Sequence, residues 1–440
     1  MIETIDLKKY GAFIEELPLV VKRGRVNRVT GLIIEADGPA VPIGTTCVIY
    51  SNDRKTVKEA EVVGFRDNRI FLMGLTHTTG IEPGSYVESR EETPTFDVSD
   101  SLLGRILDGV GRPLDGKGPL PPGLKYPIHG KPINPLERAR ITRPLNVGVQ
   151  AINGLLTCAR GQRVGIMAGT GVGKSVLLGM IARNTEATVN VIALIGERGR
   201  EVKEFVEENL GPEGLAKSVV IAAASDEPPL ARLRGAFIAT TIAEYFRDRG
   251  HDVMLMMDSV TRFALAQREL GLSVGEPPTT RGYTPSVFSL LPRLLERAGG
   301  IDGQGSITGL YTVLVEGDDL NEPVSDAVRA ILDGHIVLSR QLASHNHYPA
   351  IDILQSISRL MIDVVSKEHY ELSMRFKDIL ATYKEAEDLI NIGAYARGSN
   401  PKIDLAIEKI NAFNQYLRQG MMESRSMDES LAQLRAILVN

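Results

Sequence analysis

The sequence lacks most of the features that mark secreted proteins and proteins that span membranes. It has only two cysteines, Cys47 and Cys158, so no disulfide framework can hold the fold. No apolar run approaches the roughly 18 residues of a membrane-spanning helix, and the first residues lack the basic start and apolar core of a secretory signal. We therefore expect a cytoplasmic protein with no membrane span, whose contact with any membrane machine runs through partners.

The chain also lacks an excess of charge of either sign. Its 50 basic residues nearly balance its 55 acidic ones, which leaves a net charge of −5. No overall attraction to nucleic acid or to acidic membranes follows from this balance. The length of 440 residues predicts two or three domains with ample cores.

The first part of the chain, to about residue 90, has a β pattern. Turn signals such as Asp37-Gly38-Pro39 and Pro83-Gly84 separate short runs rich in Val and Ile. These runs are 24–35, 46–50, 59–65, 69–73 and 85–87. So many short strands predict a small closed barrel. Its few aromatics and mixed charges do not suit nucleic acid, which needs aromatics on a basic face, so we expect a ring-forming element. A segment before it, 7–17, fits either a short partner-docking helix or a frayed end.

The strongest signal is a glycine-rich turn, Ala168–Ser175, between an apolar strand at 164–167 and a helix at 176–182. Inward-pointing N–H groups and a helix N-terminus suit a phosphate there. Lys174 would reach the β- and γ-phosphates, and the Ser175 hydroxyl would bind Mg²⁺. The strict pattern opens with Gly where this chain has the small Ala168. The predicted nucleotide-binding residues of this phosphate loop are Gly169, Thr170, Gly171, Val172, Gly173, Lys174, Ser175 and Val176.

Strands and helices alternate after the phosphate loop, which predicts a mainly parallel α/β sheet. The strand at 189–195 runs into Glu197 and Arg198, and the strand near 253–257 ends at Asp258. Charged groups just past the carboxyl ends of parallel strands lie where such sheets bind ligands. Glu197 would polarise an attacking water, Arg198 would face phosphate, and Asp258 would be a second anchor for Mg²⁺. The alternative for 196–201 is a solvated charged loop. The connector at 90–145, rich in Gly and Pro, predicts turns rather than a packed core.

Several motifs together resemble a known family. The phosphate loop, Gly196-Glu197-Arg198, Glu227-Pro228-Pro229 and the segment 243–248 resemble the catalytic subunits of rotary ATP synthases. Within that superfamily, further segments resemble the flagellar type III protein-export ATPases. These segments are 257–264, 275–287, 291–299, 333–340 and 346–352. The resemblance is dense from about 100 to 365 and decides less between the flagellar and the virulence versions.

The resemblance implies an architecture and roles for single residues. It implies a RecA-like P-loop core at 91–365, between the barrel at 1–90 and a helical domain at 366–440. Three helices are expected there, at 367–389, 401–419 and 426–439, from apolar residues at helical spacing. By resemblance, Glu197 orients the hydrolytic water, Arg198 and Arg262 lie near the γ-phosphate, Glu201 and Asp258 hold Mg²⁺, Tyr348 packs on adenine, and Arg359 is an arginine finger inserted from a neighbouring subunit.

The implied activity is Mg²⁺-dependent ATP hydrolysis by a homohexameric ring that energises protein export. The implied partners are a stator-like regulatory subunit, a coiled-coil stalk protein, export gate membrane proteins, and export substrates with their chaperones. The implied location is the export apparatus at the inner membrane. Two other classes stay open: an RNA translocase, which would want a basic, aromatic barrel, and a non-catalytic rotary subunit, which would not be expected to keep Glu197.

Overall fold

The computed structural model describes residues 22–91 and 93–439. Contacts within the chain divide it into two compact units, with the boundary between Pro94 and Thr95. The helix considered at 7–17 lies outside the described residues. Among the described residues, no helix combines the length and the apolar character needed to cross a membrane.

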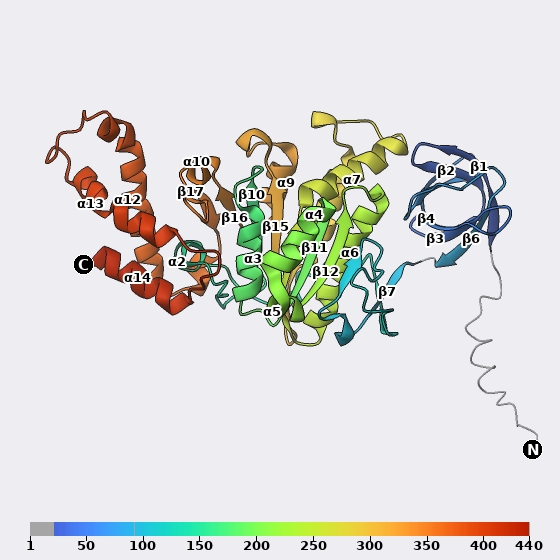
Figure 1. Ribbon diagram of the computed structural model, residues 1–440, viewed down its shortest axis with the longest axis horizontal. Helices are drawn as coiled ribbons and strands as arrows, with labels where there is room; N and C mark the ends of the chain where they lie inside the picture. The colour runs from blue at the N-terminus through green and yellow to red at the C-terminus, as the bar shows by residue number, and fades with distance from the viewer. Residues whose placement is uncertain (1–21, 92, 440) are drawn as a thin grey trace, which may run out of the picture. The chain divides into compact units, whose positions relative to one another are not determined.

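The first unit is a closed barrel of six antiparallel strands in the order β1-β2-β5-β4-β3-β6 (Figure 1, blue). Its strands are β1 (Arg23–Thr30), β2 (Ile33–Asp37), β3 (Thr46–Tyr50), β4 (Val57–Arg66), β5 (Arg69–Gly74) and β6 (Tyr86–Glu91). Alternate side chains, such as Ile34, Val62 and Leu72, fill the interior, as the two-residue period of a strand requires. The barrel is therefore confirmed. The run predicted at 24–35 is in fact the hairpin β1–β2, because Gly31 turns the chain with a φ of 58°.

The second unit is built on a nine-stranded sheet in the order β17-β16-β10-β15-β13-β11-β12-β8, with β14 paired to β15. Its strands are β8 (Ile106–Asp108), β10 (Arg163–Ala168), β11 (Val189–Glu197), β12 (Ser218–Ala224), β13 (Asp252–Asp258), β14 (Gly299–Gly300), β15 (Ser306–Leu314), β16 (Gly334–Leu338) and β17 (Ile351–Ser358). The strands from β16 to β8 along this order pair in parallel, and β14 and β17 are antiparallel additions. The expectation of a mainly parallel sheet is confirmed.

Helices cover both faces of this sheet, so its inner strands are apolar on both sides. In β11, Val191 and Ala193 pack into one core with α6, α7, α8 and α9, whereas Ile192 and Leu194 pack into the other with α2, α3 and the C-terminal helices. The helices are α2 (Gln150–Leu155), α3 (Lys174–Asn184), α4 (Gly199–Glu204), α5 (Gly211–Ala216), α6 (Pro229–Asp248), α7 (Val260–Ser273), α8 (Pro285–Leu295), α9 (Pro323–Ile331), α10 (Arg340–Ser344) and α11 (Met361–Val364). The π-helical turn Phe205–Leu210 joins α4 to α5.

The connector is more structured than its composition predicts. Its strand β8 pairs with β12 and forms one edge of the sheet, and β7 (Thr95–Val98) pairs with β9 (Leu124–Pro127). Val98 and Leu107 are fully buried in the core. The prediction of turns without a packed core is therefore wrong here, because short apolar stretches between the Gly and Pro turns are long enough to pair with a neighbouring strand.

The chain ends in three helices, α12 (Lys367–Asn391), α13 (Pro401–Leu417) and α14 (Met427–Val439) (Figure 1, red). They match the three helices expected from the sequence pattern. The rings of Phe376 and Phe413 stack between α12 and α13 with centroids 3.8 Å apart. Tyr416 lies so close to Gly154 of α2 that a Cβ there would stand 1.8 Å from the Tyr416 hydroxyl. The helical end thus packs directly on the sheet domain.

Candidate active site

The phosphate loop lies at the carboxyl end of β10 and leads into α3, whose first residue is Lys174. Gly171 and Gly173 have φ values of 78° and 87°, which favour glycine over residues with a Cβ. A Cβ on Gly169 would stand 2.8 Å from Asp318 Oδ1, so the exposed Asp318 side chain approaches this glycine closely. Ala168 is the last residue of β10 and is not among the residues with a positive φ, so this position does not require the Gly of the strict pattern.

The Lys174 ammonium is held between two carboxylates from neighbouring strands. It forms an ion pair with Asp258 at the end of β13, and its Nζ is 3.5 Å from Glu197 Oε1 at the end of β11. Thr312 of β15 donates a hydrogen bond of 2.7 Å to Asp258 Oδ1. Because β10, β15, β13 and β11 are consecutive in the sheet, their carboxyl ends bring these side chains together, as the sequence predicted for Glu197 and Asp258.

One cation faces two carboxylates here, so the group has an excess of negative charge that shifts the pKa values of its members. Burial alone would lower the pKa of Lys174, but Asp258 and Glu197 outweigh it and raise the pKa. Burial raises the pKa of Glu197 to about 7; Lys174 opposes this shift, and Asp258 and Glu201 add to it. A carboxyl with this pKa exchanges its proton near neutral pH, which suits a group that interacts with a reacting water.

The other charged residues predicted for this site lie around Glu197. A hydrogen bond with Glu197 lowers the pKa of Glu201, in the first turn of α4. Arg198 is exposed and forms an ion pair of 3.1 Å with Glu201. Arg262, in the first turn of α7, packs the aliphatic part of its side chain against Gly196. A Cβ added to Gly196 would stand 2.9 Å from the Cβ of Arg262. Its buried Nε has no hydrogen-bond partner among the described residues.

Tyr348 lies on the other side of the phosphate loop. A Cβ on Gly173 would stand 3.4 Å from the Tyr348 ring, so the ring borders the start of α3. The residue is 43% exposed. A flat aromatic ring that is open to solvent beside a phosphate loop can stack on a nucleotide base.

Arg359 is the one predicted site residue that the structure does not bring to the loop. It follows β17, and its backbone N–H donates to Asp333 O at the start of β16. The Asp333 carboxylate in turn binds Arg163 at the start of β10. The loop is at the other end of β10, which has six residues and spans roughly 16 Å at ~3.3 Å per residue. Arg359 therefore lies at the opposite end of the sheet from its own phosphate loop.

Two contacts at the site have no clear signal in the sequence. Thr312 holds Asp258, and the exposed pair Asp318 and Arg340, 3.5 Å apart, lies beside Gly169. The pair lines a cavity of about 240 Å³ next to the loop. Nothing in local spacing connects Thr312, inside a strand, to Asp258. Nor does it connect Asp318, or Arg340 at the start of α10, to a glycine more than a hundred residues away.

The residues at the loop suit Mg²⁺. The predicted ligands, the Ser175 hydroxyl and the Asp258 and Glu201 carboxylates, would offer only oxygen atoms, which is the ligand chemistry of this ion. The described part of the chain has no group of three His, Cys, Asp or Glu arranged to hold a metal. A site of this kind takes Mg²⁺ through one or two carboxylates together with the phosphates of the substrate.

This fold, with a glycine-rich loop at the carboxyl end of a central parallel strand, defines a P-loop nucleotide hydrolase. Residues 148–358 match the nucleotide-binding domain of the ATP synthase alpha/beta family, and residues 26–90 match its beta-barrel domain. Residues 365–436 match the C-terminal domain of the type III secretion ATPase EscN.

Curated relatives and solved structures agree with these matches. The chain is 54% identical to a flagellum-specific ATP synthase of Bacillus subtilis, over 95% of both chains, and 46% identical to a type 3 secretion system ATPase of Xanthomonas euvesicatoria, over 94% of this chain and 93% of that one. The structure of the assembled ATPase EscN from enteropathogenic E. coli is similar with a TM-score of 0.89 and 45% identity, over 94% of this chain and 99% of that one. The chain belongs to the family of flagellum-specific ATP synthases and type III secretion ATPases. The resemblance, the fold class and the ATPase activity expected from the sequence are confirmed.

Proposed function

We propose that this chain forms a homohexameric ring whose Mg²⁺-dependent ATP hydrolysis energises type III export of flagellar proteins. Relatives from six bacteria that are 43–54% identical carry the name flagellum-specific ATP synthase. The similar EscN structure is described as assembled, which supports a ring. The observation that carries the proposal is the ion pair of Lys174 with Asp258, next to Glu197, at the phosphate loop.

In the proposed reaction, ATP binding replaces the carboxylate partners of Lys174 with phosphate oxygens. Lys174 then no longer pairs with Glu197, which stays close to the Asp258 carboxylate. Glu197 accepts a hydrogen bond from a water molecule and orients that water toward the γ-phosphate. Ser175, Asp258 and Glu201 would hold Mg²⁺, which supplies positive charge to the phosphates when it is bound. Arg198 and Arg262 flank Glu197 and would neutralise charge that develops on the γ-phosphate.

Arg359 would complete the site of a neighbouring subunit. Its place at the far end of the sheet keeps it away from its own phosphate loop, which supports a role at the site of another subunit. An arginine finger contributes roughly 10³ to 10⁵ in rate. We therefore expect Arg359→Ala to lose turnover and to keep most of its affinity for ATP, and Arg359→Lys to rescue poorly, because an ammonium lacks the planar fork.

Mixing two inactive variants tests the ring and the finger together. Rings that contain both Arg359→Ala and Glu197→Gln chains have some interfaces where an intact Glu197 meets an intact Arg359. Activity should reappear on mixing and peak at intermediate ratios. If labelled subunits exchange and no activity returns, the trans role is wrong, or hydrolysis needs every interface intact. A linked dimer with both lesions on one chain separates these two outcomes.

The other domains have proposed roles in assembly and docking. We assign ring formation to the barrel at 1–90, and docking of export substrates and chaperones to the helices at 366–440. A structure of EscN with its central stalk EscO, similar with a TM-score of 0.87, supports a coiled-coil stalk partner. A stator-like regulatory subunit and the gate proteins of the inner membrane complete the proposed set of partners. Removing residues 1–90 should reduce assembly in sedimentation experiments while the core at 91–365 still binds nucleotide.

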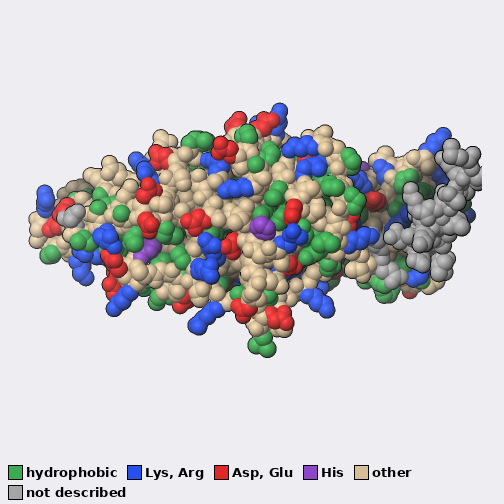
Figure 2. Space-filling view, turned by 90° about the horizontal axis from the view of Figure 1, so that it is seen from below, with side chains coloured by type: hydrophobic (Ala, Val, Ile, Leu, Met, Phe, Trp, Pro, Cys, Tyr) green, Lys and Arg blue, Asp and Glu red, His purple; other side chains and the backbone are tan. Residues whose placement is uncertain are grey.

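The alternative function is a virulence type III secretion ATPase, favoured by the 46% identity to such an ATPase. Co-purification from cells decides between them, because the chain should bring down either flagellar export components or injection components. An RNA translocase is less favoured: on the face shown in Figure 2, basic and acidic side chains are interspersed, with no continuous basic stripe. Turnover by the isolated chain would argue against a non-catalytic subunit.

A further inference from the structure

The linker between α13 and α14, residues 418–426, lies against the sheet domain and is tied to it at several points. The Arg425 N–H donates to Gly148 O at 3.1 Å, and the Asn153 side chain donates to Arg425 O at 2.9 Å. Arg183, near the end of α3, donates to Met421 O at 2.6 Å. The linker therefore joins the helical end of the chain to the two helices that begin the sheet domain, α2 and α3.

Gln419 is the centre of this linker. It is 7% exposed, and its side-chain amide donates to Gly148 O at 2.8 Å and to Glu423 O at 2.9 Å. Its Oε1 accepts from the Gln150 N–H at 2.8 Å. A buried amide with this many partners has one orientation only, because any rotation would leave a buried polar group unpaired.

The backbone of Gln419 holds the residue that borders the phosphate loop. The Gln419 N–H donates to Tyr348 O at 3.0 Å. The neighbouring His347 ring bonds to the backbone of Leu417, the last residue of α13. Gln150 in turn bonds through its side chain to Gln433 of α14. Hydrogen bonds thus run from Tyr348 through Gln419 and Gln150 to α14, and the neighbouring His347 contacts the end of α13.

We propose that Gln419 is a positioning residue that fixes Tyr348 beside Gly173. The affinity for the nucleotide base then depends on how the C-terminal helices pack against the sheet domain. The proposal rests on the proposed role of Tyr348 as the ring that stacks on adenine. Tyr348 is 43% exposed, so contacts of its own side chain determine its position only weakly. The side-chain hydrogen bonds of Gln419 fix the position of its backbone, whose N–H binds the Tyr348 carbonyl. The backbone from which the Tyr348 ring projects is thereby held in place.

The test compares a ligand that has a base with one that lacks it. Gln419→Met keeps the length of the side chain and removes its three hydrogen bonds. We expect the KM for ATP to rise about fivefold, on the scale of one or two lost hydrogen bonds, with kcat within about twofold. Inhibition by tripolyphosphate, which meets the phosphate loop without a base, should not change. Gln419→Glu keeps the oxygen that accepts from Gln150 and loses both amide N–H donors, so it should raise the KM for ATP as well. This second variant provides the test if Gln419→Met does not fold.

A double-mutant cycle with Tyr348→Ala shows whether Gln419 acts through the ring. Tyr348→Ala should itself raise the KM for ATP roughly 5- to 150-fold, the range for loss of base stacking, and Gln419→Met should then add nothing. If Gln419→Met weakens ATP equally in the Tyr348→Ala background, or weakens tripolyphosphate as well, the positioning role is wrong. If Tyr348→Ala leaves ATP affinity unchanged, the base site itself is wrong. Gln267→Met, which removes a buried amide bonded to Ser286 at the contact of α7 and α8, is the matched control and should leave the ratio of the two affinities unchanged.

Discussion

Two of the buried groups of charged side chains in the described part of the second unit are built differently. At the phosphate loop, Lys174 faces both Asp258 and Glu197, so one cation meets two carboxylates. Between α6 and the end of α8, Arg297 meets Glu244 in a closed pair. Both groups are desolvated, and only the first carries surplus charge and opens to the surface at the loop.

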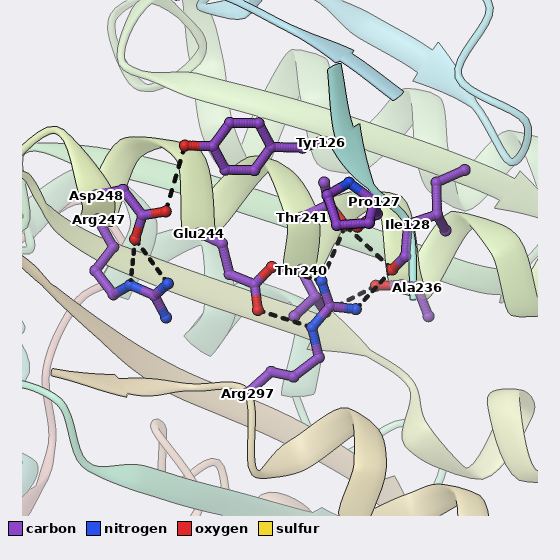
Figure 3. Close-up of polar contacts among 10 residues, drawn as sticks. All are labelled: Tyr126, Pro127, Ile128, Ala236, Thr240, Thr241, Glu244, Arg247, Asp248 and Arg297. Carbon is purple, nitrogen blue, oxygen red and sulfur yellow. Dashed lines mark hydrogen bonds and ion pairs between the residues drawn. The ribbon is translucent and has the colours of Figure 1, made fainter. Parts of the chain in front are cut away.

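The Arg297 group is complete in itself (Figure 3). Arg297 is 0% exposed and donates from Nε and Nη2 to the two oxygens of Glu244, at 2.8 and 2.6 Å. It also donates to the Thr241 hydroxyl and to Ile128 O. The pair therefore fastens the chain after β9 to α6. A group whose charges and hydrogen bonds are all paired gains nothing from binding a ligand. At Lys174 and Glu197, by contrast, the excess negative charge is balanced when Mg²⁺ binds together with phosphate.

The largest expected effect comes from breaking the open group. Lys174→Ala and Glu197→Gln should each lower turnover by about 10³-fold or more. Lys174→Ala should also weaken nucleotide binding, because phosphate charge is left unmatched. Glu197→Gln should bind ATP almost as the wild type does, because its carboxylate acts on water. Turnover and nucleotide affinity are measured on both variants, and an equal loss of affinity in both would remove Glu197 from its role.

The closed group should respond in stability rather than in catalysis. Arg297→Met leaves Glu244 buried without a partner, a change that costs about 3–5 kcal/mol. The double variant Arg297→Met with Glu244→Leu removes both charges and should recover much of that loss. Thermal unfolding midpoints give the order, and the KM for ATP of every folded variant should match the wild type. A single variant as stable as the double variant would contradict a closed, mutually dependent pair.

A smaller effect concerns pH. The Glu197 pKa of about 7 predicts that kcat/KM rises as pH increases through about 7, because the ionised carboxylate is the active form. Glu201 adds to this raised pKa, so Glu201→Gln should move the acid limb to lower pH while it lowers the rate. Glu227, whose pKa burial also raises to about 7, is the control: Glu227→Gln should leave the limb in place. If the acid limb moved equally in both variants, the limb would not report the ionisation of Glu197.

The smallest expected effect concerns the support of the open group. Thr312→Val keeps the shape of the side chain and removes its hydrogen bond to Asp258. The carboxylate then loses one of its two fixed partners, and we expect kcat to fall about two- to tenfold. Steady-state kinetics at saturating Mg²⁺ measure the change. An unchanged kcat would mean that Lys174 alone determines where Asp258 lies.

The sequence predicted the open group better than the closed one. Glu197 and Asp258 follow apolar strands, and strand ends meet at one edge of a parallel sheet, so a local pattern placed them together. Arg297 meets Glu244 and Ile128 only because α6, α8 and the connector fold onto one another, and no local spacing records such contacts. For the same reason, the edge strand β8 in the connector and the hydrogen bonds of Gln419 were not predicted. Roles that came only from resemblance, such as that of Arg359, remain predictions.

The place of Arg359 at the far end of the sheet has a consequence for dilute solutions. If catalysis needs the finger of a neighbour, a single chain can hold ATP for long periods without cleaving it. Specific activity would then rise steeply with protein concentration and level off once rings are full. A chain newly released from the ribosome would stay idle in the bulk cell volume, and hydrolysis would begin only where partners gather enough copies in one place.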